Sequence, residues 1–311
     1  MADSYPPLLT RRRVLGVAQE VTSGTYVDPS GALANTIIYD AKIEVEDLYS
    51  DGERQPHGHY FGSIDAVRGP QTGKLTFRSE LTHADDFLTL VTGCGFSVAS
   101  TTATPDSDVS AHKTLSFALW MNGLKKMLAG AAGTFTIEPA GVGQRVFVNW
   151  EFMGVFLDPV DEAMPARADI QAKGYLNRNI TLTLGGAAIP HVSSFTLDAG
   201  VEVEQRQALT AAEGVAHYVV TEINPKLTID PEARLVAQHD AYGILTAGTT
   251  QALVLTLEDA AGNSFTISAP RAQRNTVNDA DRDRKVIDNV ELMLRNNSGD
   301  DSVSLTKTDA P

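Results

Sequence analysis

The sequence predicts a mainly β protein with two tandem domains of the β-sandwich or barrel type, each flanked by one short α-helix. Two observations carry this prediction. Apolar and acidic residues alternate over 40–46, as on a strand with one buried face, and this places Glu44 and Glu46 on the other face. Nearly the same segment returns 158 positions later, at 198–204. The chain therefore carries one strand-forming pattern twice.

Four further pairs of segments follow the two copies in the same order. They are 74–77 with 226–229, 82–91 with 238–246, 133–137 with 263–267, and 151–153 with 291–293. The spacing between partners varies, as changes in loop length would make it vary. Matched blocks in a fixed order indicate a duplicated domain.

The first domain is expected over 37–160, after an N-terminal arm at 1–36 in which Gly and Pro mark turns. Its expected strands are 37–47, 68–78, 113–121, 133–138 and 145–156, with a long polar loop after the first and a tight turn at Asn122-Gly123. A short amphipathic helix is expected between the second and third strands. Thr82 can cap it, and Asp85 and Asp86 suit the positive end of its dipole.

The second domain is expected over 176–296, between an acidic, proline-containing linker at 161–175 and a polar C-terminal tail at 297–311. It repeats the plan of the first domain, with strands expected at 180–184, 192–204, 218–230, 252–257, 264–268 and 285–294. A charged loop is expected at 271–284, inside the last hairpin.

Composition restricts the classes of function. The net charge of −14 is shared by both halves, and such a surface repels phosphate rather than adhering to nucleic acid. Cys94 is the only cysteine, so no intrachain disulfide is possible. No apolar run reaches the roughly 18 residues of a membrane span, and we expect no membrane partner. Residues 11–20 resemble a signal peptide only superficially, because no cleavage site follows, so synthesis in the cytoplasm is expected.

No motif in the chain predicts catalysis, a metal site or a cofactor. Asp279, Asp281 and Asp283 alternate as in a calcium loop, but Arg284 and Val290 stand where such a loop requires Gly and Glu. His57-Gly58-His59 lacks further metal ligands at a suitable spacing. Nucleotide-binding, nucleophile-elbow and zinc-protease motifs are absent. We therefore expect a protein that is not an enzyme.

Four segments resemble the tail tube proteins (major tail proteins) of long-tailed bacteriophages. They are 15–27, 86–95, 124–137 and 148–156, and their joint order carries the resemblance more than any one string. It implies two packed, mainly antiparallel sheets with one flanking helix per domain. It also implies a structural virion protein that assembles into stacked rings around a channel for DNA delivery. Most members build the ring from six single domains, so a duplicated chain implies a homotrimer with a pseudo-hexameric ring, as in some siphoviruses.

The resemblance, read together with the duplicated acidic strand, suggests roles for particular residues. Residues expected to face the lumen are Glu44, Glu46, Glu202 and Glu204. Contacts between rings are expected from Asp51, Arg54, His57, His59, Tyr60 and Arg206. Contacts between subunits are expected from Arg11, Arg12, Arg13, Arg271 and Arg274. Expected partners are further copies of the chain, DNA and the tape measure protein in the lumen, and tail terminator and distal tail proteins at the ends.

Two alternative functions stay open on the sequence. One is another β-rich virion component, such as a tail terminator or decoration protein, which would not polymerise into long cylinders. The other is a carbohydrate-binding adhesion module, which would be monomeric with exposed aromatic platforms. Trp120 and Trp150 instead lie within apolar strands.

Overall fold

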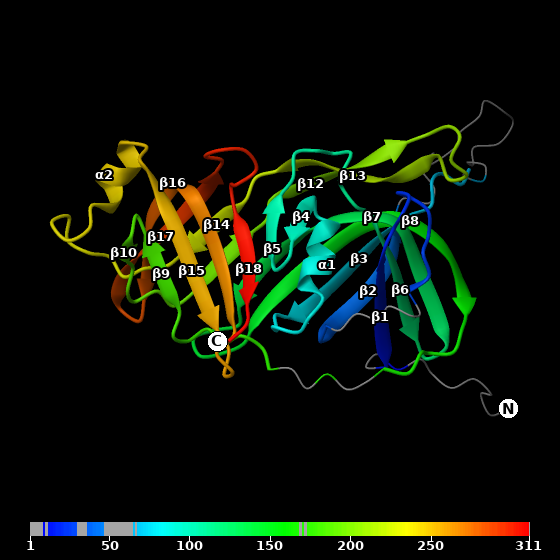
Figure 1. Ribbon diagram of the computed structural model, residues 1–311, viewed down its shortest axis with the longest axis horizontal. Helices are drawn as coiled ribbons and strands as arrows, with labels where there is room; N and C mark the ends of the chain where they lie inside the picture. Colours follow the sequence, from blue (N-terminus) through cyan, green and yellow to red (C-terminus); the bar gives the residue numbers. More distant parts are fainter. Residues whose placement is uncertain are drawn as a thin grey trace, which may run out of the picture.

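The computed structural model describes residues 9, 12–29, 36–46, 65, 67–167, 170 and 173–310, and for Glu46 it describes the main chain alone. Over these residues the chain is almost entirely antiparallel β-structure, with two short helices (Figure 1). The predicted mainly β class is confirmed. For the description below, the first unit comprises 13–161 and the second unit comprises 181–308.

The first unit is a curved sheet with a small outer layer. Its strands lie side by side in the order β1-β6-β7-β8-β3-β2. The elements are β1 (Arg13–Gln19), β2 (Ile38–Glu46), β3 (Thr72–Glu80), α1 (Phe87–Thr92), β4 (Phe96–Ala99), β5 (Thr102–Pro105), β6 (Leu115–Met121), β7 (Leu124–Pro139) and β8 (Val146–Asp161). Residues 13–19 were expected in an irregular arm and instead form β1, because Val14, Leu15 and Val17 are buried there.

The second unit has the strand order β9-β15-β16-β17-β14-β11. Its elements are β9 (Thr181–Leu184), β10 (Ala187–Ala188), β11 (Phe195–Asp198), β12 (Val201–Gln207), β13 (Val215–Ile223), β14 (Lys226–Ile229), α2 (Ala241–Thr246), β15 (Thr250–Glu258), β16 (Ser264–Arg282), β17 (Lys285–Arg295) and β18 (Ser304–Thr308). β12 and β13 leave the main sheet as a separate hairpin (the β12–β13 hairpin). The expected loop at 271–284 is mostly strand, since Ala272, Arg274 and Val277 alternate into the interior.

Strand registers in the two units agree at the centre of each sheet. Lys74 on β3 lies opposite Met153 on β8, and Lys226 on β14 lies opposite Met293 on β17. These are the residues that the sequence comparison pairs. The two helices also occupy matching positions along the chain. α1 lies between β3 and the β4–β5 hairpin, and α2 lies between β14 and the β15–β16 hairpin.

Two of the matched segments hold different places in the two units. Lys74 faces Glu44, whereas Lys226 faces Asp198, so the segments 40–46 and 198–204 are out of register by four residues. The cause is a turn at Gly200, which has φ 58° and sends the chain from β11 into β12. Likewise 133–137 lies in the second half of β7, whereas 264–267 lies at the start of β16.

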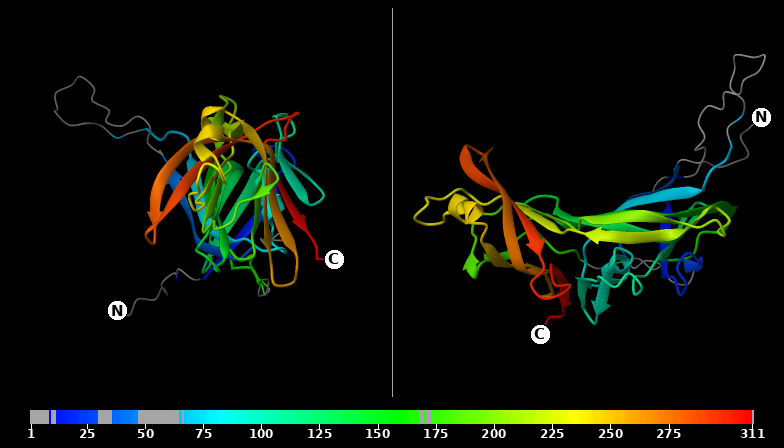
Figure 2. Two further views of the ribbon diagram at one scale, coloured as in Figure 1. Left: turned by 90° about the vertical axis from the view of Figure 1, so that its left-hand side faces the viewer. Right: turned by 90° about the horizontal axis from the view of Figure 1, so that it is seen from above.

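The two units are joined through their sheets. β11 of the second unit pairs with the second half of β7 in the first, with Leu197 opposite Ile137 and Asp198 opposite Thr136. The Ala199 N–H donates to the Phe135 carbonyl at 3.1 Å. The molecule is consequently elongated, with the β12–β13 hairpin lying along the first unit (Figure 2). We call this contact the internal joint.

The apolar core is continuous across the internal joint. Phe87 on α1 stacks edge-on against Phe135 of its own unit at 5.8 Å and against Phe265 of the other at 5.4 Å. Trp150 lies among the same rings and donates to Ser79 at 2.8 Å, which satisfies its indole N–H in the interior. Because apolar burial drives association of the two units, they are fixed against each other by packing as well as by strand pairing.

Candidate functional site

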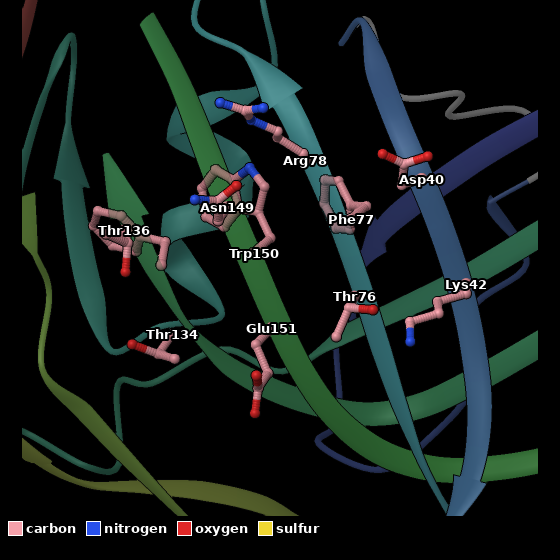
Figure 3. Close-up of a pocket in the computed structure, with 11 residues that line it drawn as sticks. Asp40, Lys42, Thr76, Phe77, Arg78, Thr134, Thr136, Asn149, Trp150 and Glu151 are labelled. Atoms are coloured by element: carbon pink, nitrogen blue, oxygen red, sulfur yellow. The ribbon is translucent and has the colours of Figure 1, made fainter. Parts of the chain in front are cut away.

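The candidate site is the polar face of the main sheet, which extends across β2, β3, β8, β7, β11, β14, β17 and β16. Alternate residues of these strands point into the core, and the others form a polar face, as the period of two requires. Lys42, Thr76, Glu151 and Thr134 stand side by side across four strands of this face (Figure 3). The polar residues of the face include Lys42, Glu44, Lys74, Thr76, Arg78, Thr134, Thr136, Glu138, Asn149, Glu151, Asp198, Lys226, Thr228 and Glu291.

Charges of both signs alternate on the polar face and form ion pairs. The Lys74 ammonium lies 2.5 Å from the Glu151 carboxylate, and the Lys42 ammonium lies 3.1 Å from the Glu44 carboxylate. Arg78 lies 3.7 Å from Glu138. These pairs are partly or largely exposed, so they hold the side chains in place without adding much stability. The polar face is thus hydrophilic and locally balanced in charge.

The four glutamates expected to face a lumen lie on two different elements. Glu44 is exposed on the polar face, and Glu46 ends β2. Glu202 and Glu204 are exposed on β12. Glu202 lies opposite Glu222 of β13, and it lines a shallow depression together with polar-face residues of the second unit. The β12 glutamates therefore border the polar face rather than continue it.

The residues expected at contacts between rings or subunits are only partly described. Asp51, Arg54, His57, His59 and Tyr60, together with Arg11, lie outside the described residues. Arg206 is exposed on the β12–β13 hairpin, and Arg12 and Arg271 are exposed as well.

Two of the expected subunit contacts are engaged within the chain. The Arg13 guanidinium donates to the Ala41 carbonyl. Arg274 is buried and donates to the Ala241 carbonyl at 3.0 Å, and it lies 2.7 Å from the His239 ring. Burial lowers the pKa of Arg274, and burial with the nearby arginines lowers the pKa of His239. Arg274 thus ties α2 to β16.

β1, β4 and β10 are edge strands of the sheet, each with one partner among the described strands, and two further open edges match the two sides of the internal joint. One is β2, the last strand of the series. Its Ala41 and Ile43 carbonyls accept bonds from Arg13 and Lys126 side chains, so their main-chain groups point away from β3. The other is the second half of β16, beyond the last pairing with β15 at Gln273. That half of β16 is the counterpart of the part of β7 that receives β11.

A comparison with known families decides the class of protein. The model of the phage tail tube protein family matches residues 10–306, almost the entire chain. The chain belongs to the phage tail tube protein family. No curated protein matches it. Membership gives the protein a structural role in the tube of a phage tail, and it confirms the family that the sequence resembles.

This tail tube protein has neither a membrane-spanning helix nor a cluster of metal ligands among its described residues. Among the described residues, no helix is long and apolar enough to cross a membrane. Within the same part of the chain, no three His, Cys, Asp or Glu side chains gather as a metal site would require. Asp279 instead accepts a hydrogen bond from Tyr242 at 2.7 Å.

The sequence analysis missed the two edges of the tail tube protein. No local pattern distinguishes 43–45 or 276–281 from a strand paired on both sides, because edge status depends on which strand ends first elsewhere. The one available signal was the duplication, since a unit that joins its copy on one side must offer the matching edges on the outer sides.

Proposed function

We propose that three copies of this chain close into a ring of six units, and that such rings stack into the tail tube through which DNA is delivered. The observation that carries the proposal is the internal joint between β7 and β11. A head-to-tail contact leaves one half exposed on each outer side, so it can repeat from copy to copy, and it forms a ring when the rotation per unit closes. The free second half of β16 and the free edge of β2 are these two halves.

The internal joint gives the register expected between chains. Leu197 faces Leu227, as Ile43 faces Leu75, so Ile43 corresponds to Leu197. By the same reasoning on β16, Asp279 corresponds to Ile137, since their partners Asp288 and Val148 hold matching places on β17 and β8. Ile43 of one copy then lies opposite Asp279 of the next, and Glu44 lies opposite Asn278. Closure removes both open edges, which would otherwise pair promiscuously.

In the ring the polar face lines the lumen. The apolar face is needed for the core, so the polar face is the side of the sheet free to meet water and DNA. Its ion pairs leave few unpaired cations to attract phosphate. Glu44, Glu202 and Glu204 supply negative charge on and beside this face, with Glu46 assigned to it from the sequence alone, and like-charge repulsion keeps DNA moving.

The same proposal covers the remaining partners. The tape measure protein and then DNA occupy the lumen, while tail terminator and distal tail proteins close the ends. The β12–β13 hairpin, with Arg206, extends from the main sheet and is assigned to the contact between rings. Asp51, Arg54, His57, His59 and Tyr60 are assigned to that contact from the sequence alone. Arg11, Arg12 and Arg271 are assigned to the contact between subunits.

The proposal is tested by electron microscopy of the purified protein and of a Val45→Pro variant. The Val45 N–H points outward on β2, as that of Ala199 does toward Phe135, so proline removes an inter-chain donor without disturbing the β2–β3 ladder. We expect hollow tubes with threefold rings from the wild type. The variant should give folded monomers with an unchanged thermal midpoint.

Val45→Ala, which keeps the N–H, is the matched control and should assemble normally. A wild-type protein that stays monomeric at high concentration contradicts the ring, and tubes of normal yield from Val45→Pro contradict the proposed edge.

A further inference from the structure

Two acidic residues lie on the open edge of β16 and have no cation beside them. Asp279 and Asp281 are exposed near the end of the strand. They point to the core side of the sheet, because Val277, two residues before Asp279, belongs to the apolar core. Among the described residues, no Lys, Arg or His side chain forms an ion pair with either aspartate. We call Asp279 and Asp281 the acidic pair.

The open edge of β2 carries two cations in the complementary situation. The Arg13 guanidinium donates to the Ala41 carbonyl, and the Lys126 ammonium donates to the Ile43 carbonyl at 3.3 Å. Neither cation has a carboxylate partner within the described part of the chain. The Nε atom of Arg13 is buried and has no hydrogen-bond partner there either. We call Arg13 and Lys126 the basic pair.

The basic pair reaches β2 from the opposite layer of the first unit. Strands β1 and β6 face β2 across the interior. Arg13 stands two residues before the core residue Leu15 on β1, and Lys126 lies opposite the core residue Leu119 of β6. Both cations therefore lie on the core side of the sheet, the side to which the acidic pair points on β16.

The register of the proposed ring brings the two pairs together. With Ile43 of one copy opposite Asp279 of the next, Asp281 lies one step further along, toward Ala41. Strands in a sheet lie about 4.8 Å apart, and residues directly opposite each other point to the same side. Each carboxylate thus lies beside a carbonyl that a cation of the basic pair already contacts. β1 and the β16–β17 hairpin lie at opposite ends of the molecule (Figure 1), so one chain cannot join its own two pairs.

We propose that the acidic pair of one copy forms ion pairs with the basic pair of its neighbour, Asp279 with Lys126 and Asp281 with Arg13. The inference rests on the proposed ring and specifies the chemistry of its seam between chains. As β16 approaches, its main-chain N–H groups donate to the two carbonyls of β2. The cations then turn from these carbonyls to the carboxylates, which are the stronger acceptors.

The internal joint has apolar residues where this seam has charges. On β7 the places of Asp279 and Asp281 are held by Ile137, which is fully buried, and Pro139. The two halves of the internal joint are tethered, whereas separate chains must find each other in solution. Complementary charge speeds such an encounter and disfavours wrong partners. A slip by one residue would also turn the acidic pair to the polar face, away from the basic pair.

Exchanging the charges tests the contact. Asp279→Lys and Lys126→Glu each place like charges at the seam, and each should raise the protein concentration needed for ring assembly about tenfold or more. A chain that carries both substitutions restores opposite charges at every seam and should assemble near the wild-type concentration. Asp279→Lys combined with Lys113→Glu, at an exposed lysine before β6, has the same net charge and should show no recovery. Thermal midpoints verify that each variant is folded.

A neutral variant gives an independent measurement. Asp281→Asn changes an exposed side chain and removes one ion pair, so ring assembly should become less sensitive to salt, which screens partly exposed charges. Glu258→Gln, exposed on β15, is the matched control and should keep the wild-type salt dependence.

The outcomes separate this inference from the proposed function. Single charge reversals that assemble as the wild type does overturn the ion pairs and leave the ring intact. A double reversal that assembles no better than its control overturns the pairing of Asp279 with Lys126, and an unchanged salt dependence of Asp281→Asn overturns that of Asp281 with Arg13. Failure of the wild type to assemble refutes the ring itself.

Discussion

At the scale of single residues, Glu20 is a buried acid of the first unit that accepts four hydrogen bonds. Its carboxylate accepts from the Gly24 and Gly130 N–H groups at 2.7 Å each. It also accepts from the hydroxyls of Thr114 and Ser116 at 2.6 and 2.7 Å. A carboxylate with four donors fixes the chain after β1 against β6 and β7, since each donor would otherwise be buried unsatisfied.

Glu20→Gln should therefore destabilise the protein. The amide keeps the shape of the side chain but presents an N–H₂ group to donors, which we expect to cost roughly 2 kcal/mol of unfolding free energy. Chemical denaturation of the two proteins measures the difference. Glu258→Gln, at an exposed position on β15, is the control and should leave the midpoint unchanged. Equal midpoints for Glu20→Gln and wild type would show that the four bonds make no net contribution to the free energy of unfolding.

Some turns could be predicted from the sequence because they depend on one or two residues. Asn122-Gly123 was expected to make a tight hairpin, and it joins β6 to β7 with positive φ at both residues, which confirms the expectation. Gly200 was not identified. A side chain there would lie 2.1 Å from the Asn224 carbonyl, so only glycine allows the turn out of the sheet. That crowding comes from the connection between β13 and β14, and it leaves no trace in the local pattern.

At the scale of elements, β18 attaches the second unit to the turn that precedes α1 in the first. The Lys307 ammonium is buried, pairs with the Asp85 carboxylate, and donates to the Thr82 carbonyl at 3.1 Å and the His83 carbonyl at 3.2 Å. Burial raises the pKa of Asp85, and the charge of Lys307 opposes that rise. The sequence analysis treated this region as a polar tail, because one lysine among threonines and a serine resembles an exposed segment.

Lys307→Met should be strongly destabilising. It leaves a buried carboxylate without its cation, a loss of about 3–5 kcal/mol for comparable pairs. The double variant with Asp85→Asn removes the charge and keeps one acceptor oxygen, for either the Thr82 or the Phe87 N–H, so it should recover part of the stability. A double-mutant cycle by chemical denaturation measures the coupling. Additive effects of the two substitutions would contradict a direct interaction.

The helix before this contact shows why element boundaries were predicted less well than element types. A helix was expected over 81–91, and α1 occupies Phe87–Thr92. Asp85 accepts from the Thr82 N–H at 2.8 Å and from the Phe87 N–H at 3.1 Å, so the chain makes a turn where the helix was expected to begin. Asp85 thus accepts from the first N–H of a shorter helix, and Asp86 stands at its N-cap position without a side-chain cap bond.

At the scale of the whole molecule, the lumen assignment predicts an effect of charge on DNA passage. Replacing Glu202 and Glu204 by lysine should slow DNA ejection from virions while tubes form normally, because cations beside the polar face attract phosphate and release counterions. Ejection kinetics measured at two salt concentrations checks this, since the delay should shrink at high salt. Glu258→Lys on β15 is the control. Normal ejection from intact virions carrying the double variant contradicts the lumen assignment.

The strand plan was predictable from alternation, and the assembly surfaces were not. Val148, Trp150 and Phe152 stand two residues apart in the strand expected at 145–156 and are buried together on β8, because a period of two is a local property. The edges of β2 and β16, by contrast, depend on strands far away in the sequence. The likeness of 40–46 to 198–204 pointed to two related units, yet register in the sheet separates the two segments by four residues.

The internal joint has a consequence for the order of assembly. Because β7 and β11 belong to one polypeptide, half the seams of the proposed six-unit ring would close as each chain folds, at the high effective concentration of tethered partners. Only three encounters between separate molecules then remain, and these seams have no covalent tether across them. Under mechanical load, a tube of such rings should therefore open at every second seam, and its fragments should have an even number of units.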